Sequence, residues 1–149
     1  MTADTVITAV EETAAVKTST KDAFTWGLGR RKSSIARVRV AAGTGNFLVN
    51  GKPLEQFFCT LQGQNRAKAP LLTAESEGNY DVFCNVKGGG ITGQADAVRL
   101  GLARALRTIN MSWDLPFREE GLLTRDARMV ERKKYGRRGA RRGFQFSKR

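Results

Sequence analysis

The sequence predicts an α+β fold that is followed by a long basic tail. Residues 34–40 and 80–87 alternate apolar and polar side chains with the period of a strand. Residues 94–108 instead repeat their apolar side chains with the period of an amphipathic helix. Strands and helices that mix in this way around one sheet are typical of α+β domains.

Three regions of different composition divide the chain. Residues 1–22 lack large apolar anchors, so we expect a disordered N-terminal extension. The globular α+β domain would span residues 23–128, with its first structured residue near Phe24. Residues 129–149 would form an extended basic tail.

The alternation in residues 34–40 predicts a half-buried strand with one cationic face. Its core face would consist of Ala36, Val38 and Val40. Arg37 and Arg39 would point the other way. The turn before the strand adds further charges and a hydroxyl: Arg30, Arg31, Lys32 and Ser33. Because the strand continues this basic cluster, we favour phosphate contact over a merely solvated face.

Residues 47–49 predict a short strand, and Asn50-Gly51 after it is a strong signal for a tight turn. Pro53 can open a short helix, because its fixed φ suits the first helical position. The apolar face of that helix would consist of Leu54, Phe57, Phe58 and Leu61. Residues 62–78 give only a weak signal.

Residues 80–87 predict a second strand whose core face consists of Tyr80, Val82, Cys84 and Val86. After a glycine-rich turn, the helix at 94–108 would bury the stripe Ala95, Val98, Leu102, Ala105, Leu106 and Ile109. Leu100 falls on the polar side of this helix and indicates a second packing surface. A later helix is expected around Phe117–Leu123.

The composition argues against catalysis and against a metal or cofactor site. The chain has no histidine, the usual general base near neutral pH and a common metal ligand. Cys59 and Cys84 lie in apolar surroundings, so we expect reduced core cysteines. No apolar run is long enough to span a membrane, and the N-terminus lacks the basic region of a secretory signal.

A glycine pattern, Gly88-x-Gly90-x-x-Gly93, matches the dinucleotide-binding fingerprint between a predicted strand and a helix. A dinucleotide fold needs several parallel βα units, whereas residues 112–116 after the helix do not form a β-branched strand. Two interpretations stay open for Gly88, Gly89 and Gly90: a phosphate site at a helix N-terminus, or a tight turn without a ligand.

The tail is the most strongly charged part of the chain. Residues 125–149 carry eleven basic and two acidic side chains, and the whole chain has a net charge of +12. Such a segment buries too little apolar surface to order itself alone, so its natural ligand is a polyanion. We interpret it as a nucleic-acid-binding arm; a solubilising or targeting tail is the alternative.

Six collinear blocks of residues resemble a known family: 29–38, 49–54, 86–95, 123–128, 131–136 and 145–149. They are similar to small-subunit ribosomal protein nine of the bacterial and organellar type. The resemblance implies a ribosomal protein S5 domain 2-like fold, with helices packed on one side of the sheet, and no catalysis. It implies binding to the 3′ major domain of small-subunit rRNA in the head, beside ribosomal proteins ten and fourteen, in the cytoplasm or alternatively in an organelle.

The resemblance also implies contact between the tip of the tail and the P-site tRNA, through Ser147, Lys148 and Arg149. Gly143-Phe144 departs from the family pattern, which leaves the path of residues 143–146 open. From charge, aromatic character and position, the residues expected to bind rRNA are Arg30, Arg31, Lys32, Ser33, Arg37, Arg39, Lys87, Gly88, Gly89, Gly90, Arg125, Arg128, Arg132, Lys133, Lys134, Tyr135, Arg137, Arg138, Arg141, Arg142, Phe144 and Phe146. The rival hypotheses are a non-ribosomal RNA-binding module and a phosphate-binding enzyme that uses the glycine-rich turn.

Overall fold

The computed structural model describes residues 24–147. The extension expected at residues 1–22 lies outside the described residues, as do Lys148 and Arg149. Within the described part, every helix and strand falls between Thr25 and Glu119.

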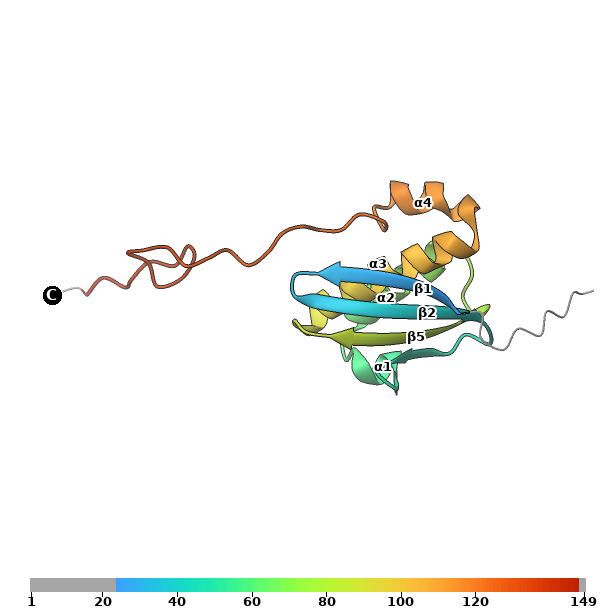
Figure 1. The fold of residues 1–149 in the computed structure, drawn as a ribbon. Coiled ribbons are helices and arrows are strands. Elements are labelled where there is room, and N and C mark those ends of the chain that lie inside the picture. Colours follow the sequence, from blue (N-terminus) through green and yellow to red (C-terminus); the bar gives the residue numbers. More distant parts are fainter. Residues whose placement is uncertain (1–23, 148–149) are drawn as a thin grey trace, which may run out of the picture.

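A five-stranded mixed sheet forms one layer of the fold (Figure 1). Its strands are β1 (Thr25–Arg31), β2 (Ser34–Ala42), β3 (Phe47–Val49), β4 (Lys52–Pro53) and β5 (Tyr80–Lys87). Their order across the sheet is β1-β2-β5-β3-β4. β3 runs parallel to β5, and the other neighbouring pairs are antiparallel. The two strands that alternation predicts, β2 and β5, therefore lie side by side.

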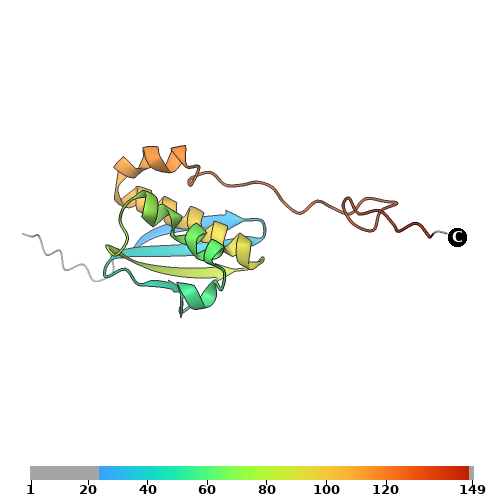
Figure 2. The same cartoon turned by 180° about the vertical axis from the view of Figure 1, so that it is seen from behind.

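Helices form the second layer, on one face of the sheet (Figure 2). α2 (Leu61–Thr73) and α3 (Ile91–Ile109) pack there, and the short α1 (Leu54–Phe57) joins β4 to α2. A 3₁₀ turn, η1 (Met111–Trp113), leads into α4 (Asp114–Glu119). The expected α+β architecture with helices on one side of the sheet is confirmed.

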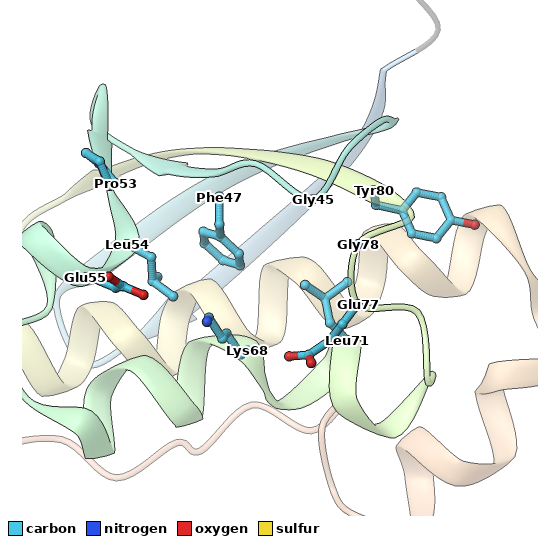
Figure 3. Close-up of a pocket in the computed structure, with 10 residues that line it drawn as sticks. All are labelled: Gly45, Phe47, Pro53, Leu54, Glu55, Lys68, Leu71, Glu77, Gly78 and Tyr80. Carbon is cyan, nitrogen blue, oxygen red and sulfur yellow. The ribbon is translucent and has the colours of Figure 1, made fainter.

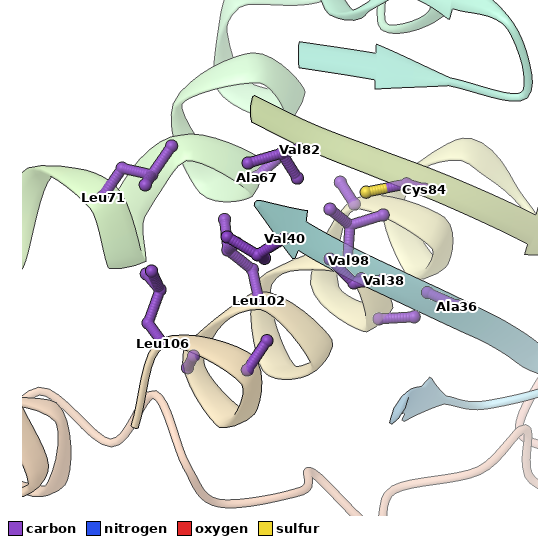
Figure 4. Close-up of a cluster of buried hydrophobic side chains, with 14 of the residues drawn as sticks. Ala36, Val38, Val40, Ala67, Leu71, Val82, Cys84, Val98, Leu102 and Leu106 are labelled. Carbon is purple, nitrogen blue, oxygen red and sulfur yellow. The ribbon is translucent and has the colours of Figure 1, made fainter. Parts of the chain in front are cut away.

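The core lies between the sheet and the helices (Figure 4). Of the alternating positions predicted to face inward, Tyr80 is half-buried, and the others are buried: Ala36, Val38, Val40, Val82, Cys84 and Val86. They meet the buried stripe of α3, which includes Ala95, Val98, Leu102, Ala105 and Leu106. Each valine or leucine buried here stabilises the fold by about 1.5–3 kcal/mol. The residues that alternate with them along both strands therefore point to the opposite face of the sheet.

β1 is a strand that the apolar pattern does not predict. Its inward positions are the buried Gly27 and Gly29, so there is no apolar alternation to detect. α3 approaches so closely that a Cβ on Gly29 would lie 1.8 Å from the carbonyl oxygen of Ala97. A Cβ on Gly27 would lie 2.0 Å from the carbonyl oxygen of Gly101. Close helix–strand packing therefore requires glycine at both positions.

The predicted helix from Pro53 to Leu61 is wrong in its extent. α1 ends at Phe57, and Leu61 begins α2 with 76% of its surface exposed. Thr60 caps α2, and its hydroxyl oxygen accepts a hydrogen bond from the Gly63 N–H at 3.3 Å. α2 gives a weak sequence signal because Gly63 and Pro70, both poor helix formers, lie inside it.

Three further expectations need correction. Ile109 at the end of α3 is 38% exposed, so it does not belong to the buried stripe. α4 covers Asp114–Glu119 rather than Phe117–Leu123, although Phe117 is buried. Cys59 is exposed and is not a core cysteine, because it lies in the loop between α1 and α2.

Two other residues lie where the sequence places them. Cys84 is buried, and burial raises the pKa of its thiol to about 12. Leu100 is buried although it lies outside the main core cluster.

Within residues 24–147, no helix combines the length and apolar character needed to cross a membrane.

Candidate nucleic-acid interface

The face of the sheet opposite the helices carries several of the predicted site residues. Arg30, Ile35 and Lys87 are neighbours in register across β1, β2 and β5. Arg37 lies between Leu28 and Asn85 in the next row, and its side chain is exposed. The structure therefore brings Arg30, Arg37 and Lys87 together on one open surface.

Aromatic side chains are interleaved with these cations. The Arg39 guanidinium carbon lies 5.3 Å from the ring centroids of both Phe24 and Phe83. The two rings form an edge-to-face pair with centroids 6.0 Å apart. Trp26, opposite Arg39 in register, is 61% exposed. The cations can meet phosphates, and the exposed ring of Trp26 can stack on an unpaired base.

Sequence reasoning missed the apolar members of this surface, Trp26, Leu28 and Phe83. The signal was present in β1, where Trp26, Leu28 and Arg30 alternate with Gly27 and Gly29. If Gly27 and Gly29 are counted as inward-facing residues, residues 26–30 show the alternation of a strand, and Trp26 and Leu28 fall on its outward face.

A hollow of about 500 Å³ opens beside these strands and is lined by Ile35, Arg37, Asn50, Asn85 and Lys87. Asn50 is fixed there, because its amide oxygen accepts from the Val86 N–H at 2.8 Å. Its amide nitrogen in turn donates to the Val86 carbonyl at 3.1 Å. The lining contains two cations and no acid, which suits an anionic ligand.

The glycine-rich turn packs against the turn between β1 and β2. A Cβ on Gly88 would lie 2.7 Å from the Ser33 carbonyl oxygen, and one on Gly89 would lie 2.0 Å from the Ser34 hydroxyl. Both glycines also have positive φ, 74° and 68°. The close contacts and the positive φ angles explain why glycine stands at these two positions, and no ligand is needed for that explanation. Gly90 has open space at its Cβ position, so packing does not account for it.

Arg31 has a different environment from its neighbours. Its Nη2 lies 2.8 Å from Asp126, its Nε lies 3.7 Å from Asp96, and its Nη1 donates to the Arg128 carbonyl at 2.6 Å. The sequence groups Arg31 with phosphate-binding residues, yet only 12% of its side chain is exposed and its donors are used within the protein. We therefore assign Arg31 a positioning role: it holds residues 126–128, the tail root, against the body.

Asp126 is the acidic centre of the tail root. Its carboxylate accepts hydrogen bonds from the side chain and the backbone of Arg128. These bonds, with the nearby charge of Arg31, hold the pKa of Asp126 well below its usual range. The carboxylate is therefore ionised near neutral pH and keeps both arginines in place.

Beyond its root the tail extends away from the body (Figure 1). A loop forms where Glu131 accepts from Lys134 at 3.0 Å and from Arg141 at 2.9 Å. These contacts, that of Arg141 first, hold the pKa of Glu131 below its usual value. Exposed ion pairs of this kind contribute little to stability, so phosphates can replace Glu131 as the partner of these cations.

The remaining tail cations are exposed: Arg125, Arg128, Arg132, Lys133, Arg137, Arg138 and Arg142. Three tail aromatics are also exposed, Tyr135 at 98%, Phe144 at 63% and Phe146 at 95%. Ser147 is exposed at the end of the described chain. The tRNA contact expected of Lys148 and Arg149 falls on residues outside the described range.

A separate hollow of about 440 Å³ lies between the β3–β4 hairpin and α2 (Figure 3). Glu55 and Glu77 contribute two carboxylates to its lining, against the single ammonium of Lys68. It contains none of the predicted site residues, and its net charge does not favour a polyanion. Among the described residues, no group of three His, Cys, Asp or Glu side chains could hold a metal ion.

Comparison with known proteins identifies the family of this chain. The family described as ribosomal protein S9/S16 matches residues 29–149. The chain is 53% identical over 122 residues to the small ribosomal subunit protein uS9 of Cytophaga hutchinsonii. That alignment covers 82% of this chain and 95% of the relative. This chain, which folds into an α+β body with an exposed cationic tail, is matched over most of its length. It therefore belongs to the ribosomal protein S9/S16 family.

Proposed function

We propose that this ribosomal protein is a structural constituent of the small subunit. It binds the 3′ major domain of the rRNA in the head, and the tip of its tail, Ser147–Arg149, contacts the P-site tRNA. Ribosomal proteins ten and fourteen are its neighbours, and its compartment is the cytoplasm. The protein acts by binding and does not catalyse a reaction.

The observation that carries this proposal is the exposure of the tail. Its arginines and aromatic rings are exposed, and the partners of these arginine side chains among the described residues lie in the tail itself: Asp126, Glu131 and backbone carbonyls. Tyr135 is 98% exposed, and an aromatic ring in that position gains contact area only against a binding partner. A polyanion that surrounds the tail supplies both the counter-charge and the surfaces for these rings.

Charge and side-chain geometry indicate how the tail binds. Lysines and arginines that neutralise phosphates release counterions from the RNA, which gives an affinity that falls steeply with salt. Arg137, Arg138, Arg141 and Arg142 have planar guanidinium groups that can hold a phosphate through two parallel hydrogen bonds. The contacts go to the backbone and therefore read RNA shape rather than base sequence.

The open sheet face supplies a second contact surface. Its cations, Arg30, Arg37 and Lys87, lie on the rigid sheet and thus meet phosphates at fixed spacing. Body and tail together would hold a folded RNA at two places. Two linked contacts bind more tightly than either one alone.

Salt-dependent binding tests the proposal. Full-length protein should co-sediment with small subunits, and its affinity for an rRNA fragment of the 3′ major domain should be measured at several salt concentrations. Removal of residues 132–149 should lower the slope of log affinity against log salt by several units, at about 0.7–0.9 per lost phosphate contact.

The matched control is Lys52→Gln, because Lys52 is an exposed cation on β4 outside the candidate surface. Its slope should equal that of the wild type. A tail-less protein with the wild-type slope would count against the proposal. Saturable binding of a nucleotide in calorimetry, without binding to small subunits, would favour the enzyme hypothesis instead.

A further inference from the structure

A cationic hollow of about 340 Å³ lies at the tail root, and we call it the root pocket. Four segments meet there: the β1–β2 turn with Lys32, α2 with Arg66, the first turns of α3 with Thr92 and Arg99, and the tail root with Arg128. Sequence reasoning did not single out Arg66 or Arg99. They lie far apart in the chain, and only the packing of α2 on α3 places them around one space.

The root pocket has an excess of positive charge. Five cationic and two acidic side chains line it. Both acids already have two cationic partners each. Asp96 lies 3.7 Å from Arg31 and 3.4 Å from Arg66, and Asp126 lies 2.8 Å from both Arg31 and Arg128. The two carboxylates therefore do not neutralise all the cations, and the pocket keeps a positive potential that concentrates anions.

Arg99 is a cation of the root pocket that has an unsatisfied donor. Its Nε is buried and has no hydrogen-bond partner, and its guanidinium makes no ion pair with any residue in the described part of the chain. A charged donor that is removed from water without an acceptor destabilises the fold. The Nη groups of the same side chain are not among the buried atoms without a partner, so an acceptor that enters the hollow can reach the guanidinium through them.

We propose that the root pocket binds one phosphate group. The guanidinium groups of Arg99 and Arg66 supply paired N–H donors, and Lys32 adds a point charge. The Thr92 hydroxyl and the N-terminus of the 19-residue α3 lie at the same hollow and add further donors.

The phosphate is one of the rRNA backbone, so the inference rests on the proposed function. Inorganic phosphate is the other possible source of the same chemistry. Because Asp126 and Arg128 line the pocket, a bound phosphate also fixes the tail root against the body. The rRNA would thereby set the direction in which the tail leaves the domain.

Arginine side-chain NMR on the full-length protein tests the inference. The Nε–H signal of Arg99 should shift and saturate when a fragment of the 3′ major domain of the rRNA is added. Inorganic phosphate is titrated in a separate arm. A saturable shift with the RNA supports the inference whether or not inorganic phosphate also produces one. A shift with inorganic phosphate alone would overturn the rRNA source, and no shift in either arm would overturn the site.

Variants complete the test. Arg99→Gln should lower the salt slope of rRNA binding by about 0.7–0.9, the value for one lost phosphate contact. Arg99→Lys should keep that slope but bind more weakly, because lysine lacks the planar fork. The control is Arg118→Gln on α4, whose side chain is 63% exposed and lies outside the pocket. Thermal melting of each variant establishes that it is folded.

The outcomes separate this inference from the proposed function. If Arg99→Gln and Arg66→Gln both keep the wild-type slope while removal of residues 132–149 lowers it, the root pocket is not a phosphate site and the proposed function stands. If removal of the tail also leaves the slope unchanged, the proposed function fails as well.

Discussion

Arg31 at the end of β1 and Asp126 in the tail root form an ion pair, with Nη2 of the arginine 2.8 Å from Oδ2 of the aspartate. The same arginine donates to the Arg128 carbonyl at 2.6 Å. The first strand of the sheet thus holds a segment that follows the last helix. The tail therefore begins at a defined place on the body, although no helix or strand is present among its described residues.

Arg31→Ala should loosen residues 126–128 while the sheet stays folded, because the tail root loses the ion pair and the hydrogen bond that join it to β1. Backbone NMR order parameters for this segment should fall from about 0.8 to below about 0.6. Arg30→Ala is the control, since Arg30 is exposed on the open sheet face and should leave the segment unchanged. Equal order parameters in the two variants would show that Arg31 does not anchor the tail.

The contacts of Asp126 with Arg31 and Arg128 should persist in moderate acid. Hydrogen bonds from Arg128, with the charge of Arg31 nearby, hold the pKa of Asp126 below its usual value of about 3.9. A pKa that folding lowers adds stability to the folded state. This stability is fully present above the pKa of the unfolded state and is lost as the pH falls through the pKa of the folded state. The same order parameters should therefore be equal at pH 7 and pH 5. Asp126→Asn should lower them at both values, and a loss of order in the wild type above pH 5 would contradict this assignment.

Gly29→Ala should destabilise the domain, because the new Cβ would lie 1.8 Å from the Ala97 carbonyl oxygen. β1 and α3 must then separate, and we expect the free energy of unfolding to fall by about 1–3 kcal/mol or more. Denaturant unfolding followed by circular dichroism measures this change. Gly143→Ala is the matched control, since its Cβ would meet nothing within 4 Å and should leave the midpoint unchanged. Equal midpoints for the two variants would refute the close approach of β1 to α3.

Removal of residues 147–149 should leave assembly of the small subunit intact and weaken P-site tRNA binding. Two cations and a hydroxyl are lost, and we expect the affinity for tRNA to fall by about tenfold, which corresponds to about 1.4 kcal/mol. Filter binding of tRNA to reconstituted subunits measures the effect. Subunits that contain a protein without residues 1–22 serve as the control. If the shortened tail gave wild-type tRNA affinity, the tip would have no such role.

The central strands and the long helix could be predicted from the sequence, because their apolar residues follow the period of one secondary structure. Val38, Val40, Val82 and Cys84 are buried where alternation places them. β1 could not be predicted in this way, since Gly27 and Gly29 replace apolar residues at its inward positions. α2 was obscured by Gly63 and Pro70, whose poor helix propensity is overridden by packing against α3.

The candidate site could be predicted only in part. The exposed cations of the tail and of β2 follow from charge and alternation. The role of Arg31 does not, because its partners Asp96 and Asp126 are distant in sequence and meet it only in the folded protein. The same reason hides Arg66 and Arg99. Local patterns identify which residues are charged, whereas tertiary packing decides which of them are already paired.

The sheet order has a consequence for folding during synthesis. β5 lies between β2 and β3, although both of these strands are made before it. In a nascent chain that ends before Tyr80, the only parts of the sheet that can form are the separate β1–β2 and β3–β4 hairpins, which share no hydrogen bonds. Small isolated hairpins are marginally stable in water. The domain should therefore fold late and in a single step, after β5 and α3 have left the exit tunnel, and it would become competent to bind RNA only then.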